Sequence, residues 1–173
     1  MTAGASTLLL EVGCEEIPDR MVEPAGRDLG QAVLDVLKDQ HLLQVPSASD
    51  PFPGTIVATP RRLAAEIEGV LMEQPDQLVE IRGPAVQVAF GPGGKPTRAA
   101  LGFAAGQEVK VEDLVRVSSD RGEVVMARRL VKGRRASEVL SELLPAAVLS
   151  LSFPKSMFWG KGRVSFVRPI RWV

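Results

Sequence analysis

Apolar and polar positions along the first 72 residues predict three strands and one long helix. Residues 7–13 (TLLLEVG) are an apolar run closed by glycine, which is typical of a short, largely buried strand. Pro18 and Pro24 then punctuate a loop that leads into a helix of about twenty residues. The apolar face of that helix recurs at a helical period, at Leu29, Val33, Val36 and Leu37.

Prolines and turn-forming residues separate this helix from the next two predicted strands. Residues 45–54 (VPSASDPFPG) hold three prolines and predict a loop. The β-branched run at residues 55–59 predicts a strand that Pro60 ends, and residues 63–72 predict another.

The second half of the chain shows a different sequence of elements. Arg82–Gly83–Pro84 is expected to break the chain before a short helix or turn that reaches Phe90, and GPGG at 91–94 predicts a tight loop. Thr97 is placed to cap a short helix through Ala105, which Gly106 would end. Residues 114–117 and 123–130 flank the turn SSDRG and predict a β-hairpin.

An amphipathic helix is predicted over residues 136–151, and a strand at the very end of the sequence. Pro145 lies inside the helical pattern, so either the helix kinks or a second helix begins there. The chain ends on Arg171–Trp172–Val173 while entering the last strand, and we expect it to be part of a longer protein. Strands and helices mix without regular βαβ spacing, which predicts an α+β fold. We expect an antiparallel sheet with packed helices, in one domain or two small subdomains with a break near 73–84.

The formal net charge of zero hides an asymmetry along the chain. Residues 1–60 carry three bases and nine acids, whereas residues 61–173 carry eighteen bases and twelve acids. Between Arg128 and Arg171 ten bases face only Glu138 and Glu142, a distribution that suits an acidic partner. The alternative is ordinary surface charge without a function.

The last 21 residues interleave bases with aromatic side chains and contain no acid. Five of the chain's eight aromatics fall here, together with Lys155, Lys161, Arg163, Arg168 and Arg171. Cations neutralise phosphates and flat rings stack on unpaired bases, so the segment is a candidate RNA-binding surface. The alternative is a core of aromatics with a solvated basic edge, and Trp159 in particular is expected to be buried. Phe158, Trp159 and Trp172 are the candidates for stacking or for a protein interface.

The sequence offers no catalytic or metal-binding constellation. Cys14 is the only cysteine and His41 the only histidine, which argues against a disulfide, a zinc centre and a nucleophile–base pair. Glu15 and Glu16 beside Cys14 are expected to oppose a lowered thiol pKa. A hydrolase would need a cleft around His41 or around the two glutamates.

Two short strings suggest nucleotide binding and do not satisfy its requirements. GPGGKPT departs from the phosphate-binding loop, because Ala89 stands in place of its first glycine and Pro96 follows Lys95. PKSM at 154–157 lacks the partner motif of a class I synthetase lysine loop. No apolar run is long enough for a membrane span and no signal peptide is present, so a cytoplasmic protein is expected, with no membrane and no DNA partner.

Arg61 and Arg62 follow Pro60 at the end of a predicted strand. Neighbours on a strand point to opposite faces, so one guanidinium is expected to pair internally and the other to face a ligand. Glu15 or Glu16 could accept one of them bidentately. A purely structural salt bridge is the competing interpretation.

Four strings of this chain together resemble one family. They are LLLEVGCEEIP (8–18), TPRRLA (59–64), GPAVQVAFGPGGKPTRAALGFAAGQ (83–107), and FPKSMFWG with FVRPIRWV (153–160 and 166–173). Their order and spacing resemble the N-terminal region of the β subunit of the bacterial heterotetrameric (α2β2) glycyl-tRNA synthetase. Cys14 stands where the family more often has threonine, and Phe158 where it tends to have a base.

The resemblance implies a part of a glycine–tRNA ligase that has no catalytic centre of its own. In that family the α subunit holds the ATP and glycine site, so this chain would bind no cofactor. Residues 1–173 would be an N-terminal module whose partners are tRNA, the α subunit and the remainder of the β subunit. The RNA-binding candidates are Arg61, Arg62, Lys155, Lys161, Arg163, Arg168 and Arg171. The alternative is a structural module that docks onto the α subunit or the rest of β without touching RNA.

Overall fold

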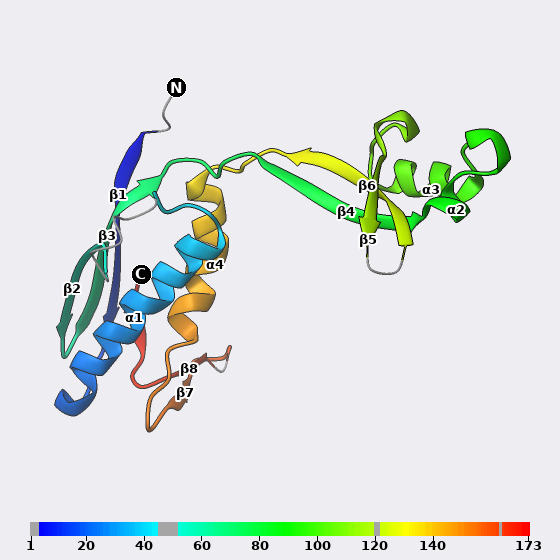
Figure 1. Ribbon diagram of the computed structural model, residues 1–173. Coiled ribbons are helices and arrows are strands. Elements are labelled where there is room, and N and C mark those ends of the chain that lie inside the picture. The colour runs from blue at the N-terminus through cyan, green and yellow to red at the C-terminus, as the bar shows by residue number, and fades with distance from the viewer. Residues whose placement is uncertain (1–3, 45–51, 120–121, 163) are drawn as a thin grey trace. The chain divides into compact units, whose positions relative to one another are not determined.

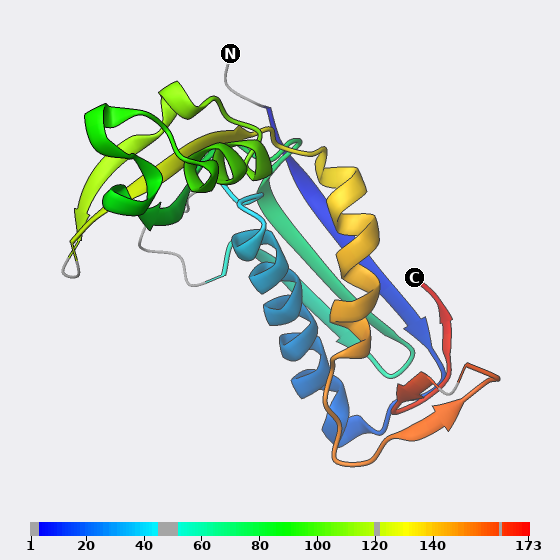
Figure 2. The same ribbon diagram turned by 90° about the vertical axis from the view of Figure 1, so that its right-hand side faces the viewer.

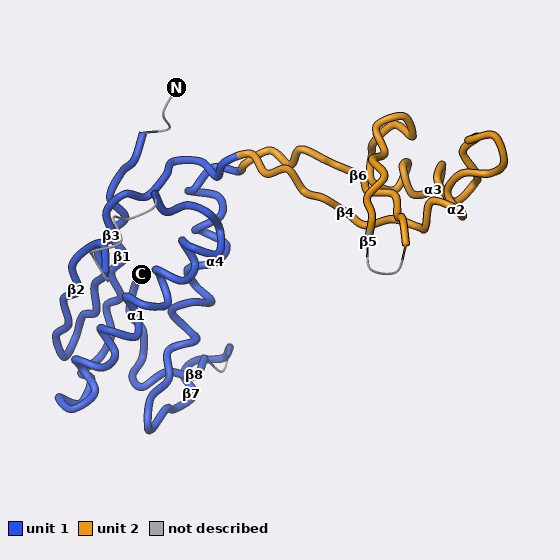
Figure 3. Tube along the Cα trace, in the orientation of Figure 1, with its two compact units in different colours: residues 1–75, 134–173 blue, residues 76–133 orange. Residues whose placement is uncertain are grey.

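A computed structural model describes residues 4–44, 52–119, 122–162 and 164–173. The chain divides into two compact units (Figure 3). Unit 1 comprises residues 1–75 and 134–173, and unit 2 comprises residues 76–133, inserted in sequence between the third strand and the last helix. Helices and antiparallel sheets make up both units, which confirms the α+β fold predicted from the sequence.

Unit 1 is built on a four-stranded antiparallel sheet in the order β2-β3-β1-β9. Its strands are β1 (Ala5–Cys14), β2 (Gly54–Thr59), β3 (Arg62–Leu71) and β9 (Ile170–Trp172). Figure 2 shows the two long helices, α1 (Asp19–Asp39) and α4 (Ala136–Leu149), lying over one face of this sheet. Strand side chains alternate between the faces, so the apolar residues that face these helices form the core. The central members of that core are Leu10, Val12, Leu63, Ile67, Leu29 and Val33.

Helix α1 begins earlier than its prolines suggested. It starts at Asp19 and contains Pro24, which was expected to lie in the preceding loop. Pro24 is exposed and costs one helical hydrogen bond, whereas Met21, Ala25 and Leu29 are buried. Burial of this apolar face therefore outweighs the proline.

The single histidine has a structural place at the end of α1. His41 adopts a left-handed backbone with a φ of 53°. Its amide donates to the Lys38 carbonyl at 3.0 Å, and the Leu42 amide donates to the Leu37 carbonyl at 2.8 Å. These two bonds are the Schellman arrangement that closes a helix, and the exposed His41 is its left-handed residue.

The C-terminal segment closes unit 1 beneath the helices (Figure 1). A short hairpin joins β7 (Met157–Trp159) to β8 (Val164–Phe166), and β9 then pairs with the end of β1. Phe166 is fully buried and meets the ring of Phe153 edge to face, with 4.9 Å between ring centroids. Helix α4 runs through Pro145 as one element, so no second helix begins there.

Unit 2 has a three-stranded antiparallel sheet in the order β4-β6-β5. Its strands are β4 (Gln77–Ala85), β5 (Val115–Ser119) and β6 (Gly122–Val131). The last two form the predicted hairpin, whose turn residues 120–121 lie outside the described residues. Helices α2 (Val86–Ala89) and α3 (Arg98–Gly106) and the 3-10 turns η1 (Pro92–Gly94) and η2 (Val111–Asp113) complete the unit. Its core is small and centres on Ala89, Ala100 and Val125.

One prediction for unit 2 is wrong, and another is confirmed only in part. Arg82–Gly83–Pro84 does not break the chain, because β4 continues through it with a register shift. Strand β4 lies at the sheet edge, where a proline costs no ladder bond, and Gly83 leaves room for the Phe103 ring of α3. Thr97 is the N-cap residue of α3, as predicted, but its hydroxyl makes no capping bond and donates instead to the carbonyl of Val88, at 2.7 Å.

The predicted loop at 45–54 falls largely on residues 45–51, which lie outside the described part of the chain. Among the helices described, none combines the length and apolar character needed to cross a bilayer.

Candidate nucleic-acid interface

Several candidate residues converge in an open groove at the end of the unit 1 sheet. The groove has a volume of about 710 Å³. It is lined by Cys14, Glu15, Val57, Thr59, Arg61, Arg62, Arg171 and Trp172, which we call the end-of-sheet groove. The sequence had singled out Arg61, Arg62, Arg171 and Trp172 from segments more than a hundred residues apart, and the pairing of β9 with β1 brings them together.

Strand register explains why Trp172 reaches Arg62. Gly13 of β1 pairs with Arg62 of β3 on one side and with Trp172 of β9 on the other. A side chain at Gly13 would overlap the indole, so the missing Cβ is what lets the ring lie across β1. The Arg62 guanidinium then stands 5.5 Å from the ring centroid, in cation–π contact.

Each arginine of the groove is paired with a glutamate. Arg62 Nη1 donates to Glu11 Oε1 at 3.2 Å, and Arg171 Nη1 lies 3.1 Å from Glu15 Oε1. Arg61 Nη2 lies 3.7 Å from Glu16 Oε2. The bidentate contact expected at Glu15 or Glu16 is therefore absent, because Arg61 makes a single long contact and Glu15 serves Arg171.

The sequence suggested that both neighbouring arginines lie on a strand, but only Arg62 does. Pro60 and Arg61 form the two-residue turn of the β2–β3 hairpin, and Thr59 pairs with Arg62 across it. Proline presets the backbone angle at the first central position of such a turn, which leaves Arg61 at its tip. The Arg61 side chain is 73% exposed and that of Arg62 is 55% exposed.

Cys14 lies at the wall of the groove but is a poor nucleophile. Its side chain is buried in the core of unit 1. Burial, reinforced by the charge of Glu15, raises the pKa of the thiol. The sequence predicted the opposing charge of Glu15 but not the burial. The groove thus holds ion pairs and an aromatic face without an activated sulfur.

The three stacking candidates lie in different environments. Trp159 is half-buried, packs against the unit 1 core, and its indole N–H donates to the Phe166 carbonyl at 3.0 Å. Phe158, its neighbour on β7, is 70% exposed. Trp172 is 45% exposed, with Arg62 over its ring.

A second, smaller cavity gathers three of the bases. It has a volume of about 170 Å³ and is lined by Pro18, Arg20, Met21, Lys155, Met157, Val167 and Arg168. We call it the basic pocket. Lys155 and Arg168 were predicted as RNA-binding residues, whereas Arg20 was missed. No sequence signal marks Arg20, because it lies in the acidic N-terminal third and joins the others only through the tertiary fold.

The remaining predicted bases lie apart from both cavities or outside the described chain. Lys161 is exposed in the turn between β7 and β8 and lines neither the groove nor the basic pocket. Arg163 lies outside the described residues.

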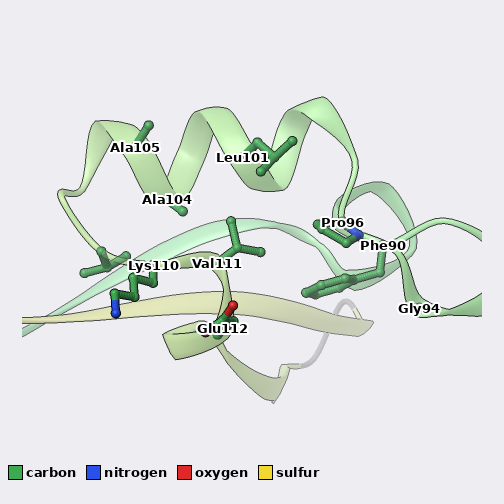
Figure 4. A pocket seen from close by; sticks show the side chains of 10 residues that line it. Phe90, Gly94, Pro96, Leu101, Ala104, Ala105, Lys110, Val111 and Glu112 are labelled. Carbon is green, nitrogen blue, oxygen red and sulfur yellow. The ribbon is translucent and has the colours of Figure 1, made fainter.

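Unit 2 contains a third hollow, about 710 Å³ in volume, between α3 and the segment that follows it. Figure 4 shows Leu101 and Ala104 of α3 above Val111 and the ring of Phe90. Its lining is mainly apolar, with Lys110 and Glu112 as the charged members. Arg116 stacks on Phe90 with 4.9 Å between the guanidinium carbon and the ring centroid.

Within the described residues, no group of three or more histidine, cysteine, aspartate or glutamate side chains could hold a metal ion. The exposed Glu16 and the half-buried Glu15 form ion pairs with Arg61 and Arg171. His41 ends helix α1.

Comparison with known proteins identifies the family. Residues 8–173 match the glycyl-tRNA synthetase beta subunit family, and the chain belongs to it. The chain is 40% identical over 168 residues to a glycine–tRNA ligase beta subunit of Acaryochloris marina. It is 42% identical over 166 residues to that of Geobacter metallireducens, and 41% over 169 residues to that of Moorella thermoacetica.

These alignments cover almost all of this chain and a small part of each relative. They span 97%, 96% and 98% of the chain but only 22%, 23% and 23% of the three relatives. The resemblance seen in the sequence motifs is thereby confirmed at the level of the family.

Proposed function

We propose that this chain is a non-catalytic module of a glycine–tRNA ligase β subunit that binds tRNA and takes part in the α2β2 assembly. In this role it supports ATP-dependent glycylation of tRNA, while ATP and glycine bind the α subunit. Membership of the beta subunit family supports the parent activity. The RNA-binding role is supported by a difference between the two cavities of unit 1. Among the described residues, the arginines of the groove are paired with glutamates, whereas the bases of the basic pocket form no ion pair.

The three arginines of the end-of-sheet groove are each paired with a glutamate, of which Glu15 lines the groove. Arg61, Arg62 and Arg171 are each within 4.0 Å of a carboxylate, so an incoming phosphate would have to compete with an existing partner. The groove is close to electrically neutral, and electrostatic attraction of a polyanion to it is weak.

In the basic pocket the bases are unneutralised. Arg20, Lys155 and Arg168 form no ion pair in the part of the chain that the structure describes. Lys161, in the next turn, forms none there either. Unpaired cations that gather in one place on a protein are the electrostatic signature of a phosphate-backbone contact.

Salt dependence of tRNA binding tests this role. The triple variant Lys155→Gln, Lys161→Gln, Arg168→Gln of the 173-residue chain should bind a glycine tRNA transcript more weakly. Its log–log salt slope should be flatter by about two to three units, since each lost phosphate contact removes about 0.7 to 0.9. The matched control is Arg27→Gln, Lys38→Gln, Lys132→Gln, which removes the same charge from other exposed positions. Equal slopes for the two triple variants would refute an RNA contact by these bases.

A second function, docking of a protein, is favoured by the open face of the unit 1 sheet. The side chains of Leu9, Val57 and Trp172 lie on the face opposite α1 and α4 and are 60%, 52% and 45% exposed. Apolar side chains framed by neutralised ion pairs suit a protein interface better than a phosphate backbone. The partner would be the α subunit or the remainder of the β subunit.

Val57→Asp separates the two functions. This change places a charge on the open face, away from the basic pocket. It should leave tRNA binding by the 173-residue chain unchanged and weaken α2β2 assembly when introduced into the whole β subunit, measured by sedimentation. Weakened tRNA binding with normal assembly would exclude docking through this face.

A further inference from the structure

The basic pocket is assembled from three segments that are far apart in the sequence. Pro18, Arg20 and Met21 come from the start of α1, Lys155 and Met157 from the segment entering β7, and Val167 and Arg168 from the link between β8 and β9. Figure 2 shows the chain passing the N-terminal end of α1 on its way into β7. Three cationic side chains thus line one small cavity, and no local sequence motif predicts this arrangement.

The carboxylates nearest in sequence do not neutralise these cations. The carboxylate of Glu16 is directed to Arg61, and only its backbone carbonyl contacts the pocket residue Arg168. Asp19 lies in the same turn as Arg20 but does not line the pocket. The positive potential inside the pocket therefore remains available to a ligand.

Arg168 is held in place before any ligand arrives. Its Nε donates to the Glu16 carbonyl at 3.0 Å and its Nη1 donates to the Val167 carbonyl at 3.1 Å. A guanidinium carries five N–H donors, so these two bonds fix its plane and leave donors for an anion. A fixed donor loses less entropy when it binds than a freely rotating one.

The rest of the pocket favours a small anion. Met21 and Val167 are buried and give the cavity an apolar floor, which strengthens electrostatic attraction by excluding water. Pro18 precedes α1 with no side-chain cap, so the positive end of the helix dipole also faces this region. A volume of about 170 Å³ lies below the range of about 300–1,000 Å³ that whole small-molecule ligands occupy, so a single group fits and a nucleotide does not.

We propose that the basic pocket binds one phosphate group through Arg20, Lys155 and Arg168. In the tRNA-binding role proposed above, on which this assignment of the source rests, the group is a single backbone phosphate of RNA. The contact positions the RNA and reads no base. The end-of-sheet groove, with its paired arginines, does not bind phosphate.

Inorganic phosphate is the probe for the pocket itself. In an amide NMR titration of the 173-residue chain at constant ionic strength, phosphate should shift the signals of Arg20, Met21 and Arg168, and acetate should not. Lys155→Gln should weaken phosphate binding about tenfold, as expected for the loss of one charge-assisted hydrogen bond. Lys155 is exposed and forms no ion pair or side-chain hydrogen bond with the residues that the structure describes, so this variant should melt with the parent.

Lys161→Gln is the matched control, because it removes an exposed lysine from the same segment outside the pocket. Its phosphate affinity should change less than twofold. Arg168→Lys keeps the charge and removes the fixed guanidinium, and it should weaken phosphate binding about as much as Lys155→Gln. Equal affinities for Lys155→Gln, Lys161→Gln and the parent chain would overturn the proposal, as would signal shifts confined to Arg61 and Arg62.

A second titration with the tRNA transcript identifies the source of the phosphate. Competition between tRNA and inorganic phosphate for the pocket signals supports an RNA phosphate. If tRNA binds and Lys155→Gln binds it as tightly as the parent chain does, the pocket assignment is wrong while the RNA-binding function stands. If phosphate binds at the pocket and tRNA does not bind, the RNA-binding function is wrong and the pocket serves a free phosphate.

Discussion

The guanidinium of Arg62 stacks on the indole of Trp172 although their strands are not neighbours. The two side chains meet 5.5 Å apart across Gly13, the residue of β1 with which both are paired. The contact depends on the absence of a side chain between them, because a Cβ at Gly13 would occupy the space of the ring. The absence of a side chain at Gly13 thereby allows the C-terminal strand to contact the hairpin that carries Arg61 and Arg62.

Gly13→Ala should therefore destabilise unit 1. The added methyl group overlaps the indole, and either the ring or β9 must move, at a cost of about 1–3 kcal/mol. The free energy of unfolding in urea measures the loss, and tryptophan fluorescence of the folded protein should shift as Trp172 becomes more exposed. Gly102→Ala is the control, since this helical glycine has open space around it and alanine should be neutral or stabilising there. Equal stabilities for Gly13→Ala and the parent chain would contradict the packing described.

Trp159→Ala should destabilise the chain far more than Phe158→Ala. The Trp159 ring packs on the core and its N–H is bonded to the Phe166 carbonyl, so truncation should cost about 3 kcal/mol. Trp159→Phe keeps most of the packing and loses the hydrogen bond, at about 1 kcal/mol. Phe158 is 70% exposed, and its replacement should stay within about 0.5 kcal/mol. The melting temperatures of the three variants test this order. A Trp159→Ala variant that melts as the parent chain does but no longer binds tRNA would show that the ring is a recognition surface.

Acid should remove a contribution to stability that comes from Arg134 and Glu142. Arg134 Nη1 and Nη2 donate to the two carboxylate oxygens of Glu142, the first at 3.0 Å and the second at 2.6 Å. These hydrogen bonds, and then the charge of Arg134, hold the pKa of Glu142 below its ordinary value of 4.5. A lowered pKa in the folded state means that the contribution is complete above the ordinary value and disappears as the pH falls through the lowered one.

Glu142→Gln should accordingly flatten the loss of thermal stability between about pH 5 and about pH 3. Glu66→Gln is the matched control, because Glu66 is an exposed glutamate of unit 1 that forms no ion pair among the described residues. Its stability should follow the parent chain over the whole pH range. Parallel curves for Glu142→Gln and the parent chain would show that the paired geometry does not persist in solution.

The 173-residue chain alone should not activate glycine. The proposed role leaves ATP and glycine to the α subunit, so this chain alone would lack the site at which the two react. ATP–pyrophosphate exchange in the presence of glycine should stay at the background rate. Exchange above background in a preparation free of α subunit would place an active site in this chain.

The sequence correctly predicted elements that are specified by residues close together in the chain. The strand before Cys14, the apolar face of α1 and the hairpin around residues 120–121 each follow from periodicity or turn chemistry. Pro24 and Pro84 were misleading because the cost of a proline depends on its neighbours in space. One lies on the exposed side of a helix and the other in an edge strand.

The candidate site shows the same limit. Arg61, Arg62, Arg171 and Trp172 could be singled out from the sequence, but their meeting depends on the pairing of β9 with β1. Arg20 could not be found at all, since its partners Lys155 and Arg168 follow more than a hundred residues later. The glutamates pair with the arginines of the groove and not with the bases of the basic pocket, and this pairing likewise depends on tertiary contacts.

Arg61 and Arg62 should respond differently to removal, because their contacts differ. Arg62 bonds Glu11 and stacks on Trp172, so Arg62→Ala should cost about 1 kcal/mol of stability and leave binding per folded molecule intact. Arg61 lies at the tip of the hairpin with one long contact, so Arg61→Ala should change stability by less than about 0.5 kcal/mol. Because Arg61 lines the groove that we assign to docking, its removal should instead weaken binding of a partner subunit.

The measurements are urea unfolding of each single variant and, in parallel, tRNA affinity and assembly of the whole β subunit with its α subunit. Arg62→Lys is the matched control, because it keeps the charge near Glu11 and loses the planar group that stacks on Trp172. Its stability should fall between those of Arg62→Ala and the parent chain. Equal losses of stability from Arg61→Ala and Arg62→Ala, with binding intact in both, would reduce the pair to a structural feature of the hairpin.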